Sequence, residues 1–162
     1  MILRPPGPDD EREFRAAQAI LAREGFDFGI TLGELSWAEF LRDCADYEVG
    51  RNLGPSKVPA SFRVADVDGV IVGRTSVRHR LNAALEVYGG HIGYAVLPAY
   101  RGRGYAKEIL RQSLALAKSV GVERALLTCD ETNMASRRVI ESAGGVFDGS
   151  DGATRRYWVE VA

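Results

Sequence analysis

The stretch Leu97–Leu110, LPAYRGRGYAKEIL, joins glycine and arginine to the start of an apolar helical pattern. Because Gly102 and Gly104 have no Cβ, this backbone can adopt a positive φ, and a ligand can approach it closely. A helix that begins just after them presents free backbone N–H groups and a partial positive charge. Arg101 and Arg103 add formal positive charge. The stretch therefore predicts a site for a multiply charged anion, most naturally a pyrophosphate.

The GRG sequence at 102–104 is by itself also typical of a tight strand-to-helix turn with solvated arginines. For those three residues alone, such a turn is the preferred interpretation. Two nucleotide motifs fit poorly. The sequence contains no G-x-x-x-x-G-K-[ST], which excludes a P-loop, and GRGYAK lacks the third glycine of G-x-G-x-x-G.

Hydrophobic periodicity predicts the elements around the turn. Residues 91–97, HIGYAVL, form a strand pattern that ends at Pro98, and a helical pattern runs from about Gly104 to Ser119. A buried strand follows at 124–129, and then a short helix that a glycine pair closes at 144–145. The second half of the chain thus alternates strand, helix, strand, helix.

The rest of the chain predicts an α+β domain with a central mixed sheet, spanning residues 1–162 as one unit. The Ser36–Glu39 sequence SWAE is a capping box that opens a helix. Residues 81–90 are ambiguous, either one helical turn or a loop. The other expected elements are a strand at 2–4, a helix from Asp9 or Asp10 to about Glu24, a hairpin of strands 61–65 and 69–79, and a final strand pair at 145–149 and 155–161.

Composition limits the function classes. The 162 residues are 46% hydrophobic, and 21 Lys and Arg against 22 Asp and Glu give a net charge of −1, which argues against a protein that coats nucleic acid. Cys44 and Cys129 form no CxxC or Cys/His metal pattern, so no metal is expected. No segment approaches the roughly 20 apolar residues of a membrane span, and no signal peptide is visible. The expected location is the cytoplasm, with no membrane partner.

The combined motifs resemble the GNAT superfamily of acyl-CoA-dependent N-acyltransferases. Its signature [RQ]-x-x-G-x-[GA] is matched at every fixed position by Arg101–Ala106. HIGYAVLPAYRGRGYAKEIL and DETNMASRRVIESAGG resemble consecutive segments of the family, and the likeness covers about Gly89–Phe147. The RRYWV, SVRHRLN and GGHIGY stretches are similar to a bacterial branch of predicted acetyltransferases, whereas the first 60 residues carry little of the signature.

The resemblance implies a GNAT fold: a central mixed twisted sheet, splayed between strands 91–96 and 125–129 and flanked by about four helices. It also implies acetyl-CoA as co-substrate, lying in the split, and transfer of its acetyl group to an amine. The pyrophosphate would rest on the backbone amides of Arg101, Gly102, Arg103, Gly104, Tyr105 and Ala106.

The same resemblance assigns further cofactor contacts. The backbones of Val96 and Leu97 would hold the pantetheine arm. Asn133 would either bond the pantetheine or cap the last helix, which is the ordinary task of an asparagine in that place. Ser136 and Arg137 would approach the CoA phosphates, although a solvated helix face explains Arg137 equally well.

Acetyl transfer to an amine requires a neutral amine, stabilisation of charge on the thioester oxygen, and departure of a thiolate. Many relatives carry glutamate where this chain has His91, whose ordinary pKa of about 6.5 suits a general base. His91 is therefore the catalytic candidate, and a half-buried structural histidine is the equal alternative. His79 is a weaker candidate, and Glu86 lies where it can help bind an amine.

The leaving-group acid departs from the family pattern. Many relatives have tyrosine seven residues after the asparagine, and that position here is Ile140. Either the thiolate, with an ordinary pKa of about 8.5, leaves unaided, or water or another residue donates the proton. Tyr94, Tyr105 and Tyr157 are available, although aromatic residues on strands and helices usually belong to the core.

The acceptor, a small-molecule or protein amine, is not specified by the sequence. Trp37 and Phe40 are spaced as core residues, whereas Asp43, Asp46 and Glu48 either attract a cationic amine or form a solvated helix face. A non-catalytic acyl-CoA sensor and a regulatory domain that binds another diphosphate are the rival functions. A homodimer is compatible with the sequence, since a C-terminal strand can pair across subunits.

Overall fold

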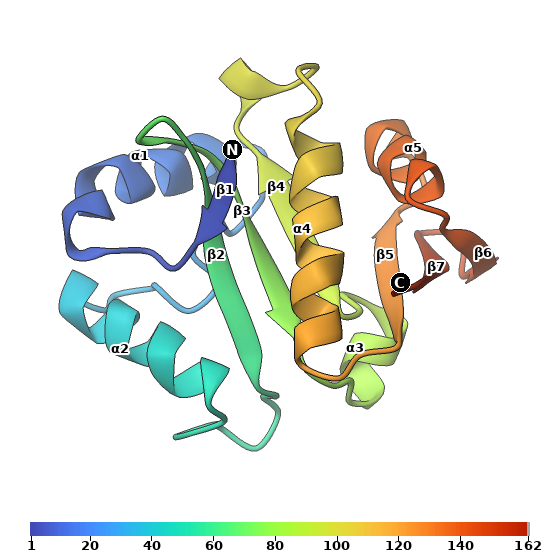
Figure 1. The fold of residues 1–162 in the computed structure, drawn as a ribbon, viewed down its shortest axis with the longest axis horizontal. Coiled ribbons are helices and arrows are strands. Elements are labelled where there is room, and N and C mark those ends of the chain that lie inside the picture. Colours follow the sequence, from blue (N-terminus) through green and yellow to red (C-terminus); the bar gives the residue numbers. More distant parts are fainter. Residues whose placement is uncertain (162) are drawn as a thin grey trace.

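Two antiparallel sheets lie side by side in the computed structural model, which describes residues 1–161 (Figure 1). The first sheet has the order β1-β2-β3-β4 and the second the order β5-β7-β6. The strands of the first are β1 (Ile2–Arg4), β2 (Ala60–Val67), β3 (Val70–Arg78) and β4 (Ile92–Val96). Those of the second are β5 (Arg124–Asp130), β6 (Val146–Ser150) and β7 (Thr154–Glu160).

The helices cover both faces of the first sheet. They are α1 (Glu11–Ala22), α2 (Trp37–Glu48), α3 (Ala83–Val87), α4 (Tyr105–Ser119) and α5 (Met134–Ser142), with 3-10 turns at Pro8–Asp10 and Pro98–Tyr100. Helix α4 lies against β3 and β4 on one face and also contacts α5, which packs on β5 (Figure 1). Helices α1 and α2 pack on the other face, where their apolar side chains meet β2 and β3.

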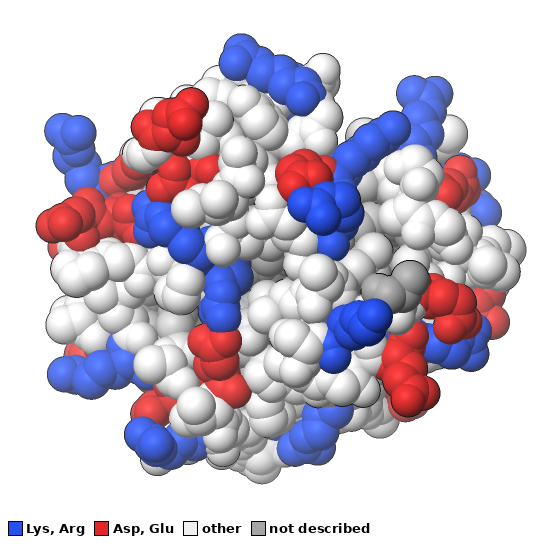
Figure 2. Space-filling model, viewed as in Figure 1, with Lys and Arg blue, Asp and Glu red and all other residues white. Residues whose placement is uncertain are grey.

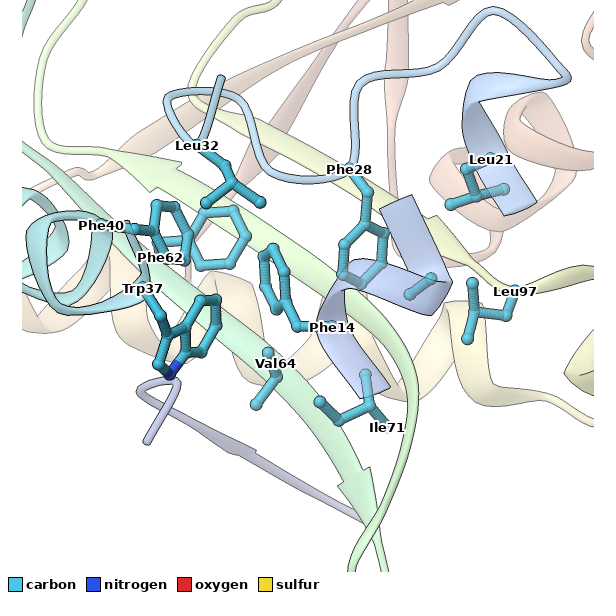
Figure 3. Close-up of a cluster of buried hydrophobic side chains, with 11 residues drawn as sticks. Phe14, Leu21, Phe28, Leu32, Trp37, Phe40, Phe62, Val64, Ile71 and Leu97 are labelled. Atoms are coloured by element: carbon cyan, nitrogen blue, oxygen red, sulfur yellow. The ribbon is translucent and has the colours of Figure 1, made fainter. Parts of the chain in front are cut away.

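An aromatic cluster fixes α1 and α2 to the sheet (Figure 3). The Phe14 ring centroid lies 4.9 Å from that of Phe28 and 5.1 Å from those of Trp37 and Phe40. The Trp37 indole N–H donates to the Gly7 carbonyl at 3.0 Å, so its polar group is satisfied. The prediction that Trp37 and Phe40 are core residues is confirmed.

The β2–β3 hairpin sets the faces on which the side chains of β3 lie. Its turn places Asp68 and Gly69 at φ of +52° and +84°, and the Asp66 carboxylate accepts the Gly69 N–H at 2.7 Å. Along β3 the side chains alternate. Thr75 and its odd-numbered neighbours face α4, and the even-numbered residues 74, 76 and 78 face the α1–α2 side.

The two sheets join at one point and diverge from it. The His91 N–H donates to the Leu126 carbonyl at 2.7 Å, and the Leu126 N–H donates to Nδ1 of His91 at 2.9 Å. No ladder pairs β4 with β5 beyond this junction within residues 1–161. The expected splay between these strands is confirmed, but the split divides the expected mixed sheet into two antiparallel ones.

Most sequence predictions of the elements are confirmed, including the Ser36–Glu39 capping box. The ambiguous stretch 81–90 contains α3, so the described chain has five α-helices rather than about four. In the second sheet β7 is bonded on both sides and β6 is an edge strand, and a homodimer formed through a C-terminal strand stays a prediction.

The surface and the helices add two findings. Lysine, arginine, aspartate and glutamate are interspersed over the face shown in Figure 2, without a large field of one sign. Across residues 1–161, every helix is too short or too polar to cross a membrane.

Candidate active site

The glycine turn leads directly into α4. Gly102 and Gly104 adopt φ of +75° and +84°, a region that disfavours other residues, and a Cβ on either would meet no atom within 4 Å. The space above the turn is therefore open. The backbone N–H groups of residues 102–106 donate to no group in the described chain, whereas those of Lys107 and Glu108 return to the Gly104 carbonyl. Five consecutive free donors at a helix N-terminus have the geometry to bind an anion.

The two arginines of the turn have different tasks. Arg101 turns away from the open space: its Nε donates to the Val96 carbonyl at 3.1 Å, and its Nη2 forms an ion pair with Glu24 at 2.6 Å. Its own N–H bonds the Pro98 carbonyl at 3.3 Å. The prediction that Arg101 contacts the pyrophosphate is therefore corrected. Arg101 instead connects the turn to β4 and to Glu24. Arg103 is exposed and makes no ion pair within residues 1–161, so its charge is available.

One wall of the split is the free edge of β4. The bonds from Arg78 N–H to the His91 carbonyl and from Leu97 N–H to the Val72 carbonyl fix which residues of β4 bond to β3. Because antiparallel pairs alternate, the backbone groups of Tyr94 and Val96 point away from β3, towards β5. The N–H of Leu97 donates to Val72 and its carbonyl accepts the Tyr100 N–H, so the geometry does not favour the predicted contact of Leu97, and the predicted contact of Val96 stays a prediction.

The other wall comprises β5 and the start of α5. Asn133 caps α5 by accepting the Ser136 N–H at 3.0 Å, which is the ordinary alternative to its predicted contact with pantetheine. Ser136 reaches across the split, and its hydroxyl lies 3.0 Å from that of Tyr94. The Nε of Arg137 is buried and has no hydrogen-bond partner in the described chain. Such an orphaned donor, on the helix that lines the split, fits a ligand that brings carbonyl or phosphate oxygens.

His91 lies at the closed end of the split and is 8% exposed. Burial, and secondarily the charge of Arg78, lowers its pKa, so the imidazole is neutral at pH 7. Its Nδ1 lone pair already accepts the Leu126 N–H, so the proton of the neutral ring is on Nε2. The ring therefore has no free lone pair while this bond persists. This geometry favours the structural alternative, and a general-base role for His91 stays a prediction.

The other predicted acid–base residues lie elsewhere. The His79 Nε2 is 2.9 Å from the Ser61 hydroxyl, which donates to Glu48 at 3.1 Å. Glu86 is exposed on α3. Ile140, at the position of the family tyrosine, is a buried core residue. His79 is the weaker base candidate and Glu86 the candidate for amine binding, whereas Ile140 marks the position at which the tyrosine of many relatives is absent.

Of the three tyrosines, Tyr94 bonds Ser136 across the split. Burial raises its pKa to about 12, so the phenol stays protonated at neutral pH. The Tyr157 hydroxyl donates to Glu141 at 3.0 Å inside the core of the second sheet. Tyr105 is the first residue of α4.

A cavity of about 200 Å³ opens on the opposite face of the first sheet, between α2, β2, β3 and α3. Tyr47, Lys57, Ser76 and Arg78 are among its fourteen lining residues, none of which is aspartate or glutamate. Arg78 sits above Gly93 of β4: a Cβ on Gly93 would lie 3.4 Å from its Nη1. Arg78 therefore lies between the cavity and the strand that borders the split.

The acidic residues predicted to attract an amine do not line this cavity. Asp46 bonds Asn52 at 2.7 Å, and Glu48 is paired with Arg63. Sequence reasoning missed Ser76 and Arg78. The alternation of residues 74, 76 and 78 on one face of a predicted strand was the available signal.

Comparison with known proteins places this geometry in a family. The family model of the acetyltransferase (GNAT) domain matches residues 1–146. Among curated proteins, none matches the sequence. The chain belongs to the GNAT acetyltransferase family, whose acetyl donor is acetyl-CoA.

Solved structures share the fold at low sequence identity. RimJ of Mycobacterium smegmatis, in complex with CoA-disulfide, is 22% identical with a TM-score of 0.71, over 98% of this chain and 80% of that one. The GNAT-family acetyltransferase of Streptococcus pneumoniae is 16% identical with a TM-score of 0.67, over 99% of both chains. Salmonella typhimurium yncA, a putative acetyltransferase solved with its cofactor acetyl-CoA, is 15% identical with a TM-score of 0.66. The match covers 99% of this chain and 94% of that one.

Proposed function

We propose that residues 1–162 form one acetyl-CoA-dependent N-acetyltransferase domain, which passes the acetyl group directly to a primary amine in a ternary complex. The observation that carries this proposal is the run of free amides at 102–106, at the open end of the split between the two sheets. Family membership supports it, as do the CoA ligands of the RimJ and yncA structures.

The residues around the split would bind and orient the donor. The amides of 102–106 and the charge of Arg103 would hold the pyrophosphate. The backbone groups of Tyr94 and the N–H of Val96, whose carbonyl already accepts from Arg101, would bond the pantetheine amides, as a further strand does. The orphaned Nε of Arg137 would gain a partner there.

The chemistry would use these same elements. When bound, acetyl-CoA supplies an activated thioester. The N–H groups of β4 that face the split would donate to the thioester oxygen as charge develops on it. Tyr94, protonated at neutral pH, would give its hydroxyl proton to the departing thiolate, with Ser136 orienting the phenol.

Deprotonation of the acceptor is assigned to solvent. The imidazole of His91 has no free lone pair, and the cavity lining contains no carboxylate. The amine would therefore react as the fraction that is already neutral. In this case kcat/KM rises with pH until the pH reaches the pKa of the acceptor amine. The pH at which this rise ends shifts when an acceptor of different pKa is used.

Thermal unfolding with acetyl-CoA tests the donor site. Gly104→Glu places a carboxylate in the anion site, and Gly121→Glu is a matched control, because Gly121 also has a positive φ with open space around it at the far end of α4. Acetyl-CoA at about 100 times its Kd should stabilise the wild type and Gly121→Glu by about 2.7 kcal/mol each, and the folded Gly104→Glu variant not at all. Equal stabilisation of all three proteins contradicts this site.

A non-catalytic acyl-CoA sensor is the second candidate. Ile140 in place of the family tyrosine and the engaged Nδ1 of His91 favour it. Thiol release in the presence of an amine panel separates the two, because a sensor binds acetyl-CoA without releasing CoA.

Competition between CoA and ATP tests the third candidate, a domain that binds another diphosphate. The free thiols of Cys44 and Cys129 suit the proposed cytoplasmic location.

A further inference from the structure

Two arginines on the face of β3 that points to the α1–α2 side form no ion pair with a carboxylate within residues 1–161. Arg74 and Arg78 point to the same face, and neither forms an ion pair there. Buried or half-buried charges in proteins are normally paired. These two neighbouring cations thus lack an ion-pair partner within residues 1–161.

Arg74 is fully occupied by the protein. Its guanidinium donates to the carbonyls of Phe28, Asp27 and Gly93 at 3.0, 2.9 and 3.1 Å. It also stacks over the Phe26 ring at 4.7 Å. All three nitrogens bond backbone carbonyls and the side chain is buried, so Arg74 holds the loop that follows α1 against the sheet.

Arg78 is only partly occupied. Its Nη1 donates to the carbonyls of Gly89 and Gly90 at 3.0 and 3.2 Å, which fixes the plane of the guanidinium. Nε and Nη2 have no partner among the residues described, and the side chain lines the cavity. A fixed guanidinium with donors free on one edge matches the two oxygens of a carboxylate.

The remaining lining supports an anion with an apolar body. Lys57 is exposed at the rim and adds a second positive charge, and the Ser76 hydroxyl has no partner within residues 1–161. Val58, Phe62 and Leu85 provide apolar walls. The volume of about 200 Å³ is below the roughly 300–1,000 Å³ of pockets for drug-sized ligands, so the occupant is small.

We propose that the acceptor is a small amine that carries a carboxylate, and that Arg78 binds this carboxylate, assisted by Lys57 and Ser76. This inference rests on the proposed acetyltransferase function. The Arg78 guanidinium lies against Gly93, where a Cβ would be 3.4 Å from its Nη1 and 3.7 Å from its Nη2, so the proposed carboxylate site adjoins the strand that borders the split. An amino acid with an apolar side chain has this chemistry.

Matched ligands that differ only in the carboxylate test the inference. Binding of leucine, alanine and phenylalanine and of their three amides is measured by calorimetry, with and without saturating CoA. At least one carboxylate should bind about tenfold tighter than its amide, because a charged hydrogen-bonded pair is lost in the amide. Equal affinities within every pair, or no binding of any carboxylate, overturn the proposal.

Variants then assign the preference to residues. Arg78→Gln should abolish the preference for the carboxylate. Because Arg78 also bonds two carbonyls, this variant can fail to fold, and the exposed Lys57→Gln should then still reduce the preference severalfold. Lys118→Gln removes an exposed lysine at the far end of α4 and should leave the preference unchanged. An unchanged preference in both cavity variants contradicts the assignment.

Transfer assays separate this inference from the function on which it rests. If the wild type acetylates the amides as fast as the amino acids, the acetyltransferase function stands and the carboxylate site is overturned. If the amino acids bind tightly but no CoA is released with any acceptor, the carboxylate site stands and the transferase function fails.

Discussion

The hydroxyl groups of Tyr94 and Ser136 lie 3.0 Å apart and form a hydrogen bond across the gap between β4 and α5. The bond joins side chains that are 42 residues apart in sequence and lie on opposite walls of the split. It also places a protonated phenol inside the split, where the sequence alone offered no acid at the position of Ile140.

We expect Tyr94→Phe to lower kcat by roughly 10- to 100-fold with little change in the KM for acetyl-CoA. General acids typically contribute about 10²–10⁴-fold, and a thiolate with a pKa of about 8.5 already leaves readily, so the effect lies at the low end. Steady-state kinetics measures this split. Tyr157→Phe removes a hydroxyl that bonds Glu141 outside the split and should leave kcat within about twofold. Unchanged kcat in Tyr94→Phe assigns the proton to water.

Two substitutions of His91 separate a base from a structural residue. The Asn side-chain oxygen can accept the Leu126 N–H as Nδ1 does, so His91→Asn should retain both folding and turnover. His91→Leu leaves that buried N–H unpaired and should lower the free energy of unfolding by about 1–3 kcal/mol. Denaturant unfolding and thiol release report the two effects. A folded His91→Asn without turnover would restore His91 as the general base.

The same histidine predicts how stability depends on pH. Its folded-state pKa is lowered by burial, so between that value and about 6.5 the unfolded chain binds a proton that the folded chain does not. The contribution of His91 is therefore complete above about pH 6.5 and is lost as the pH falls below it. His79, whose pKa is also lowered, acts in the same direction.

Urea unfolding between pH 7.5 and pH 5 measures this dependence. Stability should fall over that range before the carboxylates protonate, and the slope should be smaller in His91→Asn and smallest in the His79→Asn, His91→Asn double variant. A slope that is identical in all three proteins contradicts the neutral buried state of these rings.

Arg74→Met should lower the free energy of unfolding by roughly 3 kcal/mol or more, because three carbonyls lose their donor and a buried side chain is replaced. The exposed Arg12→Met on α1 is the control and should stay within about 0.5 kcal/mol of the wild type. A small effect of Arg74→Met would mean that the loop at residues 26–28 is held by its apolar contacts alone.

The sequence was informative where the interactions are local. The glycine turn, the Ser36–Glu39 capping box and the helix of Tyr105–Ser119 depend on neighbours in the chain, and each was predicted. The direction of Arg101 depends on Glu24, 77 residues away, and the task of His91 depends on Leu126, 35 residues away. Such pairings have no local signal.

The residues around the Arg78 cavity were hard to predict from the sequence for the same reason. Arg74 and Arg78 were visible as arginines on a strand, but their missing counterions and the cavity beside Arg78 require α2, α3 and the loop before β2 to be in place. The predicted acids Asp46 and Glu48 find basic partners only in the folded chain.

The glycine turn lies at the start of α4, whereas the Arg78 cavity lies on the face of the first sheet opposite α4, and this arrangement bears on the order of binding. Neither ligand has to pass through the site of the other, so both binary complexes should form. Initial rates measured against both substrates should then give intersecting double-reciprocal lines. Desulfo-CoA, which lacks the thiol, should compete with acetyl-CoA but not with the amine.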